Sequence, residues 1–339
     1  MKVKLKSSAT MALAGSLILF LMACSQGQVN QGEAGQGQAA QGQAADAGPT
    51  EGIAPDIPGI GAGGTKIELI KDGFAGAEGP VPLPDGSLLF SEINGNRITK
   101  VNLDGSTEPF VEPSGDSNGI GFDSKGRLIA TQCTEGKTGI AVVYPKGSET
   151  FLASDYQGKP FDRPNDLVID KKGGVYFTDP APQWIIYVPP GGKAILAADA
   201  AKDMITRPNG IQLSPDEKTL YVNDIRGEYM IAYDVQPDGS LRNRRNFAKY
   251  VGVETRPEGG FAAGADGMAV DNQGNVYTTS NAGVDVFNSK GEHVGTIPTP
   301  RHPQNLAFGG PDKKTLYLVG RNSVFKMPTL AQGYMGRAK

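Results

Sequence analysis

Short apolar segments recur along this chain, and a polar residue stands 10 or 11 positions ahead of each one. An alternating apolar stretch and a tight turn come between the two, as in Asp266-Gly267-Met268 followed by Gln273-Gly274. The segments start 40, 47, 45, 56 and 40 residues apart. Their first residues are Leu88, Leu128, Val175, Leu220, Val276 and Leu316. Alternation with a period of two predicts β-strands, and a repeat of roughly 40–50 residues made of short strands is typical of a β-propeller.

The repeats predict an all-β fold, a six-bladed propeller with four-stranded blades. The last repeat stops after residues 323–327, one strand short, and residues 66–70 precede the first repeat with a strand-like alternation. Pairing of these N- and C-terminal strands would close the ring and remove an exposed sheet edge. We therefore expect the propeller to span residues 66–327, followed by a C-terminal tail at 328–339.

The N-terminal residues predict export rather than structure. Residues 1–23 carry three lysines and then an apolar core of 13 residues, which is too short to span a bilayer and typical of a signal peptide. The core ends Leu21-Met22-Ala23-Cys24, which resembles a bacterial lipobox with Cys24 as the lipidated residue. Residues 24–65, rich in Gly, Gln and Ala, predict a disordered tether.

These features predict an exported bacterial lipoprotein, periplasmic or at the cell surface, that meets the membrane only through its lipid anchor. A soluble secreted protein cleaved nearby is the alternative. Only Cys24 and Cys133 are present, so a lipidated Cys24 would leave no intrachain disulfide. The net charge is −3 and both signs are interspersed, which argues against nucleic acid as a partner. We expect a monomer.

The polar residues ahead of the apolar segments are the candidate site. They are Glu78, Asn118, Asn165, Asn209, Asp266 and Asn305. Equivalent positions of propeller blades are related by rotation about one axis, so these side chains would converge on a central funnel. Carboxylate and amide oxygens favour a hard divalent cation, Ca²⁺ before Mg²⁺ or Mn²⁺, and with only two histidines and no thiolate cluster Zn²⁺ is disfavoured. The alternative is turn chemistry, because Asn and Asp before Gly are common turn formers.

The motifs around these positions also carry a family resemblance. They are Glu-Gly-Pro at 78–80, Arg-Pro-Asn-Asp at 163–166, Tyr-Phe-Thr-Asp-Pro at 176–180, Pro-Asn-Gly-Ile at 208–211, Asp-Gly-Met-Ala-Val-Asp at 266–271 and Asn-Leu-Ala-Phe-Gly-Gly at 305–310. In order and spacing they resemble the gluconolactonase/SMP-30/luciferin-regenerating enzyme family across residues 66–327. The resemblance implies a six-bladed propeller with a divalent ion, usually calcium, in its channel. It places the metal ligands at Glu78, Asn165, Asn209 and Asp266.

The resemblance also places substrate-contacting positions near Asn118 and Arg163, and we add Asn305 at the funnel mouth. Many bacterial members have a Cys-Glu-His stretch after the second strand of the second blade. Here Cys133 stands where that histidine is expected. Cys133 is therefore a candidate substrate-binding residue. Either its thiol takes the place of the histidine as proton carrier, or the site lacks a proton carrier.

Such a site predicts a carboxylic-ester hydrolase that opens sugar-derived lactones. A divalent ion polarises the lactone carbonyl and positions a water for attack. Asp266 is the candidate general base, with pure metal ligation as its alternative role. Two other functions stay open: a phosphotriesterase or other esterase with the same ligands, and a non-catalytic propeller that binds a sugar acid, which the change at Cys133 favours.

Overall fold

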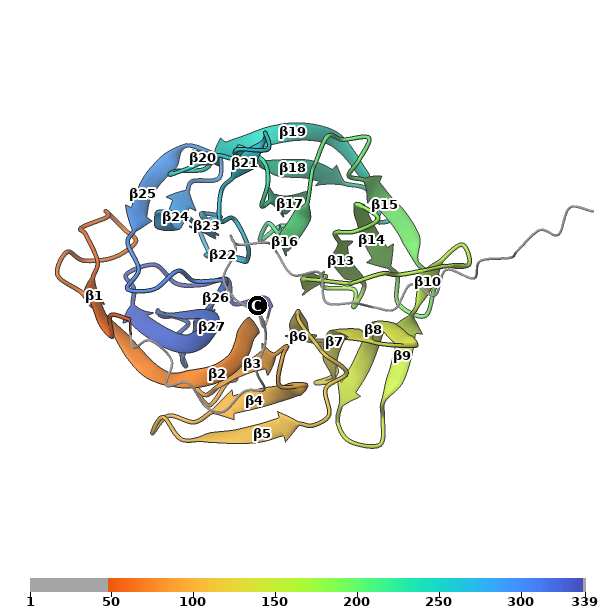
Figure 1. Ribbon diagram of the computed structural model, residues 1–339, viewed down its shortest axis with the longest axis horizontal. Coiled ribbons are helices and arrows are strands. Elements are labelled where there is room, and N and C mark those ends of the chain that lie inside the picture. The colour runs from red at the N-terminus through yellow and green to blue at the C-terminus, as the bar shows by residue number, and fades with distance from the viewer. Residues whose placement is uncertain (1–47, 338–339) are drawn as a thin grey trace, which may run out of the picture. The chain divides into compact units, whose positions relative to one another are not determined.

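The structure is a computed structural model that describes residues 48–337, and every regular element in that range is a β-strand. The all-β prediction is therefore confirmed. Four sheets have four antiparallel strands and one has seven, and Figure 1 shows them arranged around a common centre, as in a propeller. The predicted signal peptide and Cys24 lie outside the described residues. Within the described part of the chain, no helix has the length and apolar character needed to cross a bilayer.

The four-stranded sheets each consist of strands that follow one another in the chain. The first contains β6 (Ile120–Phe122), β7 (Leu128–Thr134), β8 (Lys137–Tyr144) and β9 (Thr150–Ala153). The second contains β12 (Leu167–Ile169), β13 (Val175–Asp179), β14 (Trp184–Val188) and β15 (Ile195–Asp199). The third contains β16 (Pro208–Leu213), β17 (Thr219–Asp224), β18 (Tyr229–Val235) and β19 (Leu241–Lys249). The fourth contains β22 (Met268–Val270), β23 (Val276–Ser280), β24 (Gly283–Phe287) and β25 (His293–Ile297).

The seven-stranded sheet brings the two ends of the repeat region together. Its strands are β26 (Asn305–Gly309), β27 (Thr315–Pro328), β2 (Lys66–Pro82), β3 (Leu88–Glu92), β4 (Arg97–Val101) and β5 (Thr107–Val111), with β1 (Glu51–Ile53) beside β2. The first part of β2 pairs with β27, as in Leu69 opposite Phe325, and its last part pairs with β3. The strand expected at 66–70 thus lies against the last repeat. Two short hairpins complete the strands: β10 (Asp155–Tyr156) with β11 (Lys159–Pro160), and β20 (Glu254–Thr255) with β21 (Phe261–Ala262).

The predicted strand positions agree closely with the structure. Four of the six apolar segments begin at the predicted residue, and the other two begin one residue earlier, at Thr219 and Thr315. Buried side chains from consecutive sheets pack face to face; for example, Leu89 of β3 joins Ile120 and Leu128 of the next sheet in one apolar cluster. Burial of apolar surface between sheets is therefore the main force that holds them in place.

The structure corrects the extent of the predicted tether at its C-terminal end. Residues Glu51–Ile53 form β1, which pairs with β2, and Ala54, Ile57 and Ile60 are buried in an apolar cluster. The composition of residues 24–65 as a whole predicts disorder because these few apolar residues are a small fraction of the segment. Because they find a complementary surface on the fourth sheet and on β27, this end of the segment is part of the fold.

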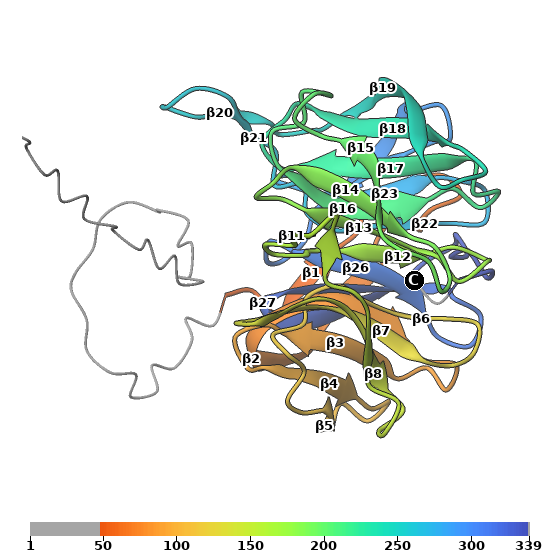
Figure 2. The same ribbon diagram turned by 90° about the vertical axis from the view of Figure 1, so that its right-hand side faces the viewer.

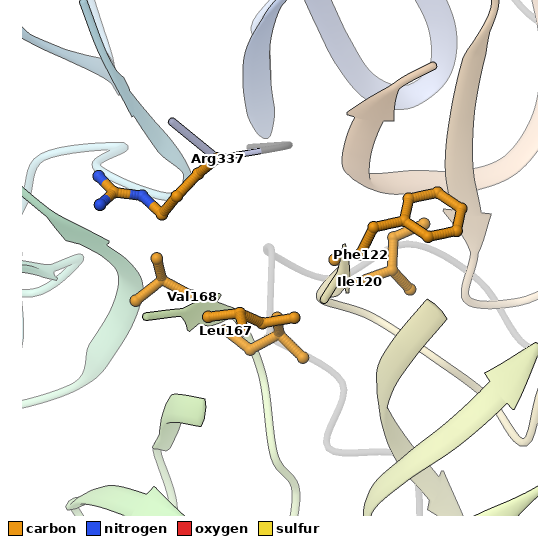
Figure 3. Close-up of a pocket in the computed structure, with 7 residues that line it drawn as sticks. Ile120, Phe122, Leu167, Val168 and Arg337 are labelled. Carbon is orange, nitrogen blue, oxygen red and sulfur yellow. The ribbon is translucent and has the colours of Figure 1, made fainter. Parts of the chain in front are cut away.

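The C-terminal tail is also packed against the sheets. Gly333 forms an isolated bridge with Asp271, and the Arg337 guanidinium pairs with Glu217 at 3.2 Å and lies over the Tyr334 ring at 4.8 Å. Figure 3 shows Arg337 at the rim of a small cavity that is otherwise apolar and includes Ile120. The tail thus contacts the fourth and fifth repeats, and Arg337 lines a cavity with residues of the second and third repeats.

Candidate metal and active site

The six polar residues identified in the sequence lie where the inner strands begin, and we call them the ring residues. They are Glu78, Asn118, Asn165, Asn209, Asp266 and Asn305. Three of them lie within β2, β16 and β26, and the other three stand two residues ahead of β6, β12 and β22. The inner strands contact one another in the cyclic order β2, β6, β12, β16, β22, β26 and β2 again. Consecutive ring residues therefore come from neighbouring inner strands.

Backbone hydrogen bonds join the ring residues of the second, third and fourth repeats. The Gly119 amide, next to Asn118, donates to the Asn165 carbonyl oxygen at 2.9 Å. The Asn165 amide donates to the Thr178 carbonyl oxygen at 2.8 Å, and the Thr178 hydroxyl donates to the Asn209 carbonyl oxygen at 2.7 Å. These hydrogen bonds link the ring segments of the second, third and fourth repeats in order.

Close contacts through glycines continue this arrangement. The Gly210 amide donates to the Asp266 carbonyl oxygen at 3.1 Å, and a Cβ atom at Gly210 would lie 2.0 Å from that oxygen. A Cβ atom at Gly267 would lie 2.0 Å from Asn305 Oδ1. Glycine is required at both positions because no side-chain atom fits between the neighbouring inner strands.

The circle closes between the last and first repeats. Asn305 Nδ2 donates to Glu78 Oε2 at 3.1 Å, and the Gly79 amide donates to the same oxygen at 3.1 Å. A Cβ atom at Gly79 would lie 2.2 Å from the Asn118 carbonyl oxygen. The structure therefore brings all six predicted residues into one continuous circle of contacts, and Asn305 orients the Glu78 carboxylate within it.

Two of the amide oxygens are candidates for contact with a bound cation or substrate. Asn118 Oδ1 and Asn209 Oδ1 are buried and have no hydrogen-bond partner within residues 48–337. A buried polar atom without a partner costs about 1–3 kcal/mol, so each of these two oxygens calls for a partner such as a cation, a substrate group or a water. The Glu78 carboxylate in the same circle is only 3% exposed. No three His, Cys, Asp or Glu side chains of the described chain cluster as metal ligands, so a cation here would depend on the amide oxygens. Oxygen donors of this kind fit a hard divalent cation.

The residues at the ends of the second strands hold the loops that lead to the ring. Asp179 accepts hydrogen bonds from the Asp162 and Arg163 amides, both at 2.9 Å. Asp224 accepts them from the Thr206 and Arg207 amides at 2.8 and 2.9 Å. Both carboxylates are buried and bind backbone, so their role is to position the loops.

Burial also perturbs one of these carboxylates. The Asp179 side chain is fully buried, and this burial raises its pKa to about 6, against the two backbone N–H donors that favour the charged form. The amide of Arg163 donates to this carboxylate, so the protonation state of Asp179 changes the strength of a hydrogen bond that holds the segment just before Asn165.

The structure places the other predicted residues around the ring. Cys133 Sγ lies 3.7 Å from the Asp162 carbonyl oxygen, so the thiol adjoins the loop that carries Arg163. Arg163 has no salt bridge within the described residues, and Asp179 binds its backbone amide. His302, to which sequence analysis assigned no role, also lies nearby: a Cβ atom at Gly264 would lie 2.7 Å from its Nε2, which puts this histidine beside the segment before Asp266.

Sequence reasoning missed Arg207 as a counterpart of Arg163. The triplet Arg163-Pro164-Asn165 recurs as Arg207-Pro208-Asn209, so the repeat itself contained the signal. In both cases a buried carboxylate binds the arginine amide, and in both the ring asparagine follows two residues later.

Comparisons with known proteins agree with this fold. The SMP-30/Gluconolactonase/LRE-like region matches residues 76–321. The gluconolactonase of Zymomonas mobilis is 31% identical over 302 residues, which cover 79% of this chain and 83% of the relative. The lactonase drp35 of Staphylococcus saprophyticus is 29% identical over 258 residues, which cover 70% of this chain and 74% of the relative.

A solved structure is similar over nearly the same region. The gluconolactonase XC5397 from Xanthomonas campestris is 27% identical, with a TM-score of 0.69 over 84% of this chain and 99% of that protein. The matched region contains all six ring residues. This chain therefore belongs to the SMP-30/gluconolactonase/LRE-like family.

Proposed function

We propose that this protein is a lactone hydrolase that depends on a divalent cation, most readily Ca²⁺, held among the ring residues. The observation that carries the proposal is the buried Asn209 amide oxygen, which has no hydrogen-bond partner within residues 48–337 and lies in the same circle as Glu78; the Asn118 oxygen, equally without a partner there, is left for the substrate. Glu78, Asn165, Asn209 and Asp266 would hold the cation. The relatives named gluconolactonase and lactonase support a lactone as substrate.

The chemistry follows from the groups around the ring. A divalent cation held by these residues would supply polarisation of the lactone carbonyl and a lower pKa for an associated water. Asp266 accepts a proton from the attacking water as the new C–O bond forms at the carbonyl carbon. The C–O bond within the lactone then breaks, and the proton passes from Asp266 to the departing alkoxide. The product is a hydroxy acid. Asn305 keeps the Glu78 carboxylate in place through its 3.1 Å hydrogen bond.

The fold that we propose for this function is a six-bladed propeller. Its blades would be the four four-stranded sheets and two further blades within the seven-stranded sheet. In this arrangement the first part of β2 is the outer strand of the last blade and the last part is the inner strand of the first blade. The pairing of β2 with both β27 and β3 supports this division.

Acid release from glucono-1,5-lactone in a pH-stat tests the proposal. We expect a rate above background that chelator removes and Ca²⁺ restores. The Asp266→Asn variant should lose about 10²-fold or more in kcat, the usual contribution of a general base. The control is Asp104→Asn, which changes an exposed carboxylate in the turn between β4 and β5. A rate no higher than background with the cation present would contradict the proposal.

One observation favours a second function. Cys133 replaces an expected histidine and lies beside the Arg163 loop, so the ring could bind a sugar acid without turning it over. Calorimetry with gluconate on the Ca²⁺-loaded protein separates the two functions, because a binder gives heat of binding without lactone hydrolysis. Activity confined to phosphotriesters in the same assay would identify the esterase alternative.

A further inference from the structure

In the second and third repeats, a threonine of the second strand holds the ring residue of the next repeat. Thr131 Oγ1 donates to the Asn165 carbonyl oxygen at 3.0 Å, and Thr178 Oγ1 donates to the Asn209 carbonyl oxygen at 2.7 Å. Both threonines stand three residues after the first residue of their apolar segment. The residues at this position in the six repeats are Ser91, Thr131, Thr178, Asn223, Thr279 and Val319. An amide side chain thus stands there only in the fourth repeat, which precedes the repeat of Asp266.

Asn223 makes the corresponding contact with Asp266 and extends it. Asn223 Nδ2 donates to the Asp266 carbonyl oxygen at 2.6 Å and to Thr278 Oγ1 at 2.8 Å. The side chain is fully buried, and Figures 1 and 2 show its strand, β17, in the sheet next to that of β23, which contains Thr278. The amide nitrogen of Asn223 therefore binds both the ring segment and the second strand of the fifth repeat.

Tyr250 determines which end of the Asn223 side chain faces Asp266. The Tyr250 hydroxyl accepts a hydrogen bond from the Asp224 amide at 3.1 Å and donates one to Asn223 Oδ1 at 3.0 Å. Because Oδ1 is bound to this hydroxyl, the nitrogen is the end that faces the Asp266 carbonyl oxygen, and only the nitrogen can donate to it. Tyr250 is also buried, so the pair is shielded from competing water.

Both backbone polar groups of Asp266 are bound by the surrounding strands. Its carbonyl oxygen accepts hydrogen bonds from Asn223 Nδ2 at 2.6 Å and from the Gly210 amide at 3.1 Å. Its amide donates to Thr279 Oγ1 at 2.8 Å, and that hydroxyl donates to the Gly264 carbonyl oxygen at 3.1 Å. The partners of Asp266 come from β16, β17 and β23. Since the direction of the Cα–Cβ bond follows from the backbone, these contacts set the point from which the Asp266 carboxylate extends.

We propose that Asn223, oriented by Tyr250, is the positioning residue for Asp266 in lactone hydrolysis. A general base must lie within hydrogen-bond reach of the water that it deprotonates, so a displacement of about 1 Å lowers the rate. Asn223 acts through the Asp266 backbone and contacts neither the water nor the lactone. The inference rests on the proposed lactonase function for the role of Asp266, but the contact between the two residues can be tested without substrate.

A double-mutant cycle on kcat tests the role of Asn223. Asn223→Ala should lower kcat for glucono-1,5-lactone by about 10–100-fold, the usual loss when a residue that orients a site residue is removed. In the Asp266→Asn background the same change should have little further effect, because the base that Asn223 positions is already absent. A residue that only stabilises the fold would lower kcat by the same factor in both backgrounds, and that result would overturn the proposal.

Tyr250→Phe tests the orientation of the amide, and it decides the case if Asn223→Ala does not fold. This variant keeps Asn223 and removes the hydroxyl that binds Oδ1, so we expect kcat to fall by about tenfold. Tyr317→Phe is the matched control, because Tyr317 is also buried and its hydroxyl donates to the Gly86 carbonyl oxygen at 3.0 Å, in the turn between β2 and β3. Equal kcat values for the two variants would overturn the role of Tyr250.

Hydrogen exchange tests the contact without metal or substrate. The amides of residues 264–267 should exchange about tenfold faster in Asn223→Ala than in the wild type, because Asp266 loses its 2.6 Å hydrogen bond. The turn between β2 and β3 should exchange at the wild-type rate. A wild type that opens no lactone would contradict the proposed function, and exchange would still show whether Asn223 holds Asp266. Unchanged exchange at 264–267 would overturn the inference, even in a protein that hydrolyses lactones.

Discussion

Gly210 offers the sharpest test of the packing that holds the ring. It lies in β16, where the register against β17 shifts between Pro208 and Ile211, and it follows the ring residue Asn209. Its φ lies outside the left-handed region, so Gly210→Ala adds a Cβ atom without backbone strain. That atom would lie 2.0 Å from the Asp266 carbonyl oxygen. The obstacle is backbone and cannot rotate away.

The size of the effect follows from this distance. A carbon and a carbonyl oxygen approach to about 3.3 Å, so the two inner strands must separate by roughly 1.3 Å. Overpacking of this kind costs about 1–3 kcal/mol of stability, which leaves a protein of this size folded. A displacement of about 1 Å between reacting groups can cost 10²-fold in rate. We therefore expect kcat/KM to fall about 10²-fold and Ca²⁺ affinity to fall with it.

The assay combines three measurements on the same samples: lactone hydrolysis, Ca²⁺ titration by calorimetry and thermal melting. Gly61→Ala is the control, because its Cβ atom would meet only Met327 Cε, at an ordinary 3.7 Å. The expected pattern is a large loss of activity and affinity with a modest loss of stability in Gly210→Ala alone. A Gly210→Ala variant with wild-type activity and Ca²⁺ affinity would show that this contact does not set the geometry of the site.

Two further predictions concern stability. The pKa of Asp179 is raised from 3.8 to about 6 in the fold, so the folded state binds the proton more tightly than the unfolded state. The free energy of unfolding of the wild type, relative to Asp179→Asn, should therefore fall by about 3 kcal/mol as the pH rises from about 4 to about 6 and stay level above that. Urea unfolding at several pH values measures this, and parallel curves would contradict it. Ile67 is fully buried in the part of β2 near β27, so Ile67→Ala should lower the free energy of unfolding by about 2–5 kcal/mol. Its exposed neighbour Glu68 is the control, and equal melting temperatures for Ile67→Ala and Glu68→Ala would argue against the N-terminal strand as part of the cooperative fold.

The strands and the ring residues were predictable because their signals are local and repeated. Alternation of apolar and polar residues defines a strand within a few positions, and six copies reinforce one another. Asn118 and Asp266, for instance, are identified by their spacing to Leu128 and Val276. Rotational repetition then implies that equivalent positions meet, and the circle of contacts around the inner strands agrees with that inference.

Other features depend on contacts between distant residues that have no local signature. The packing of Ile57 against the last repeat and the pairing of Arg337 with Glu217 join segments more than 100 residues apart. The role of Asp224 was likewise hidden, since its sequence context suggests a polar strand end and the structure shows a buried carboxylate holding the amides of Arg207 and Arg226.

The sequence by itself thus determined which residues could form the ring, because the repeat period encodes rotation about an axis. Only the tertiary structure decided how the loops beside the ring are held. The loops come from different repeats, and the buried carboxylates Asp179 and Asp224 fix them by binding loop amides that water would otherwise satisfy.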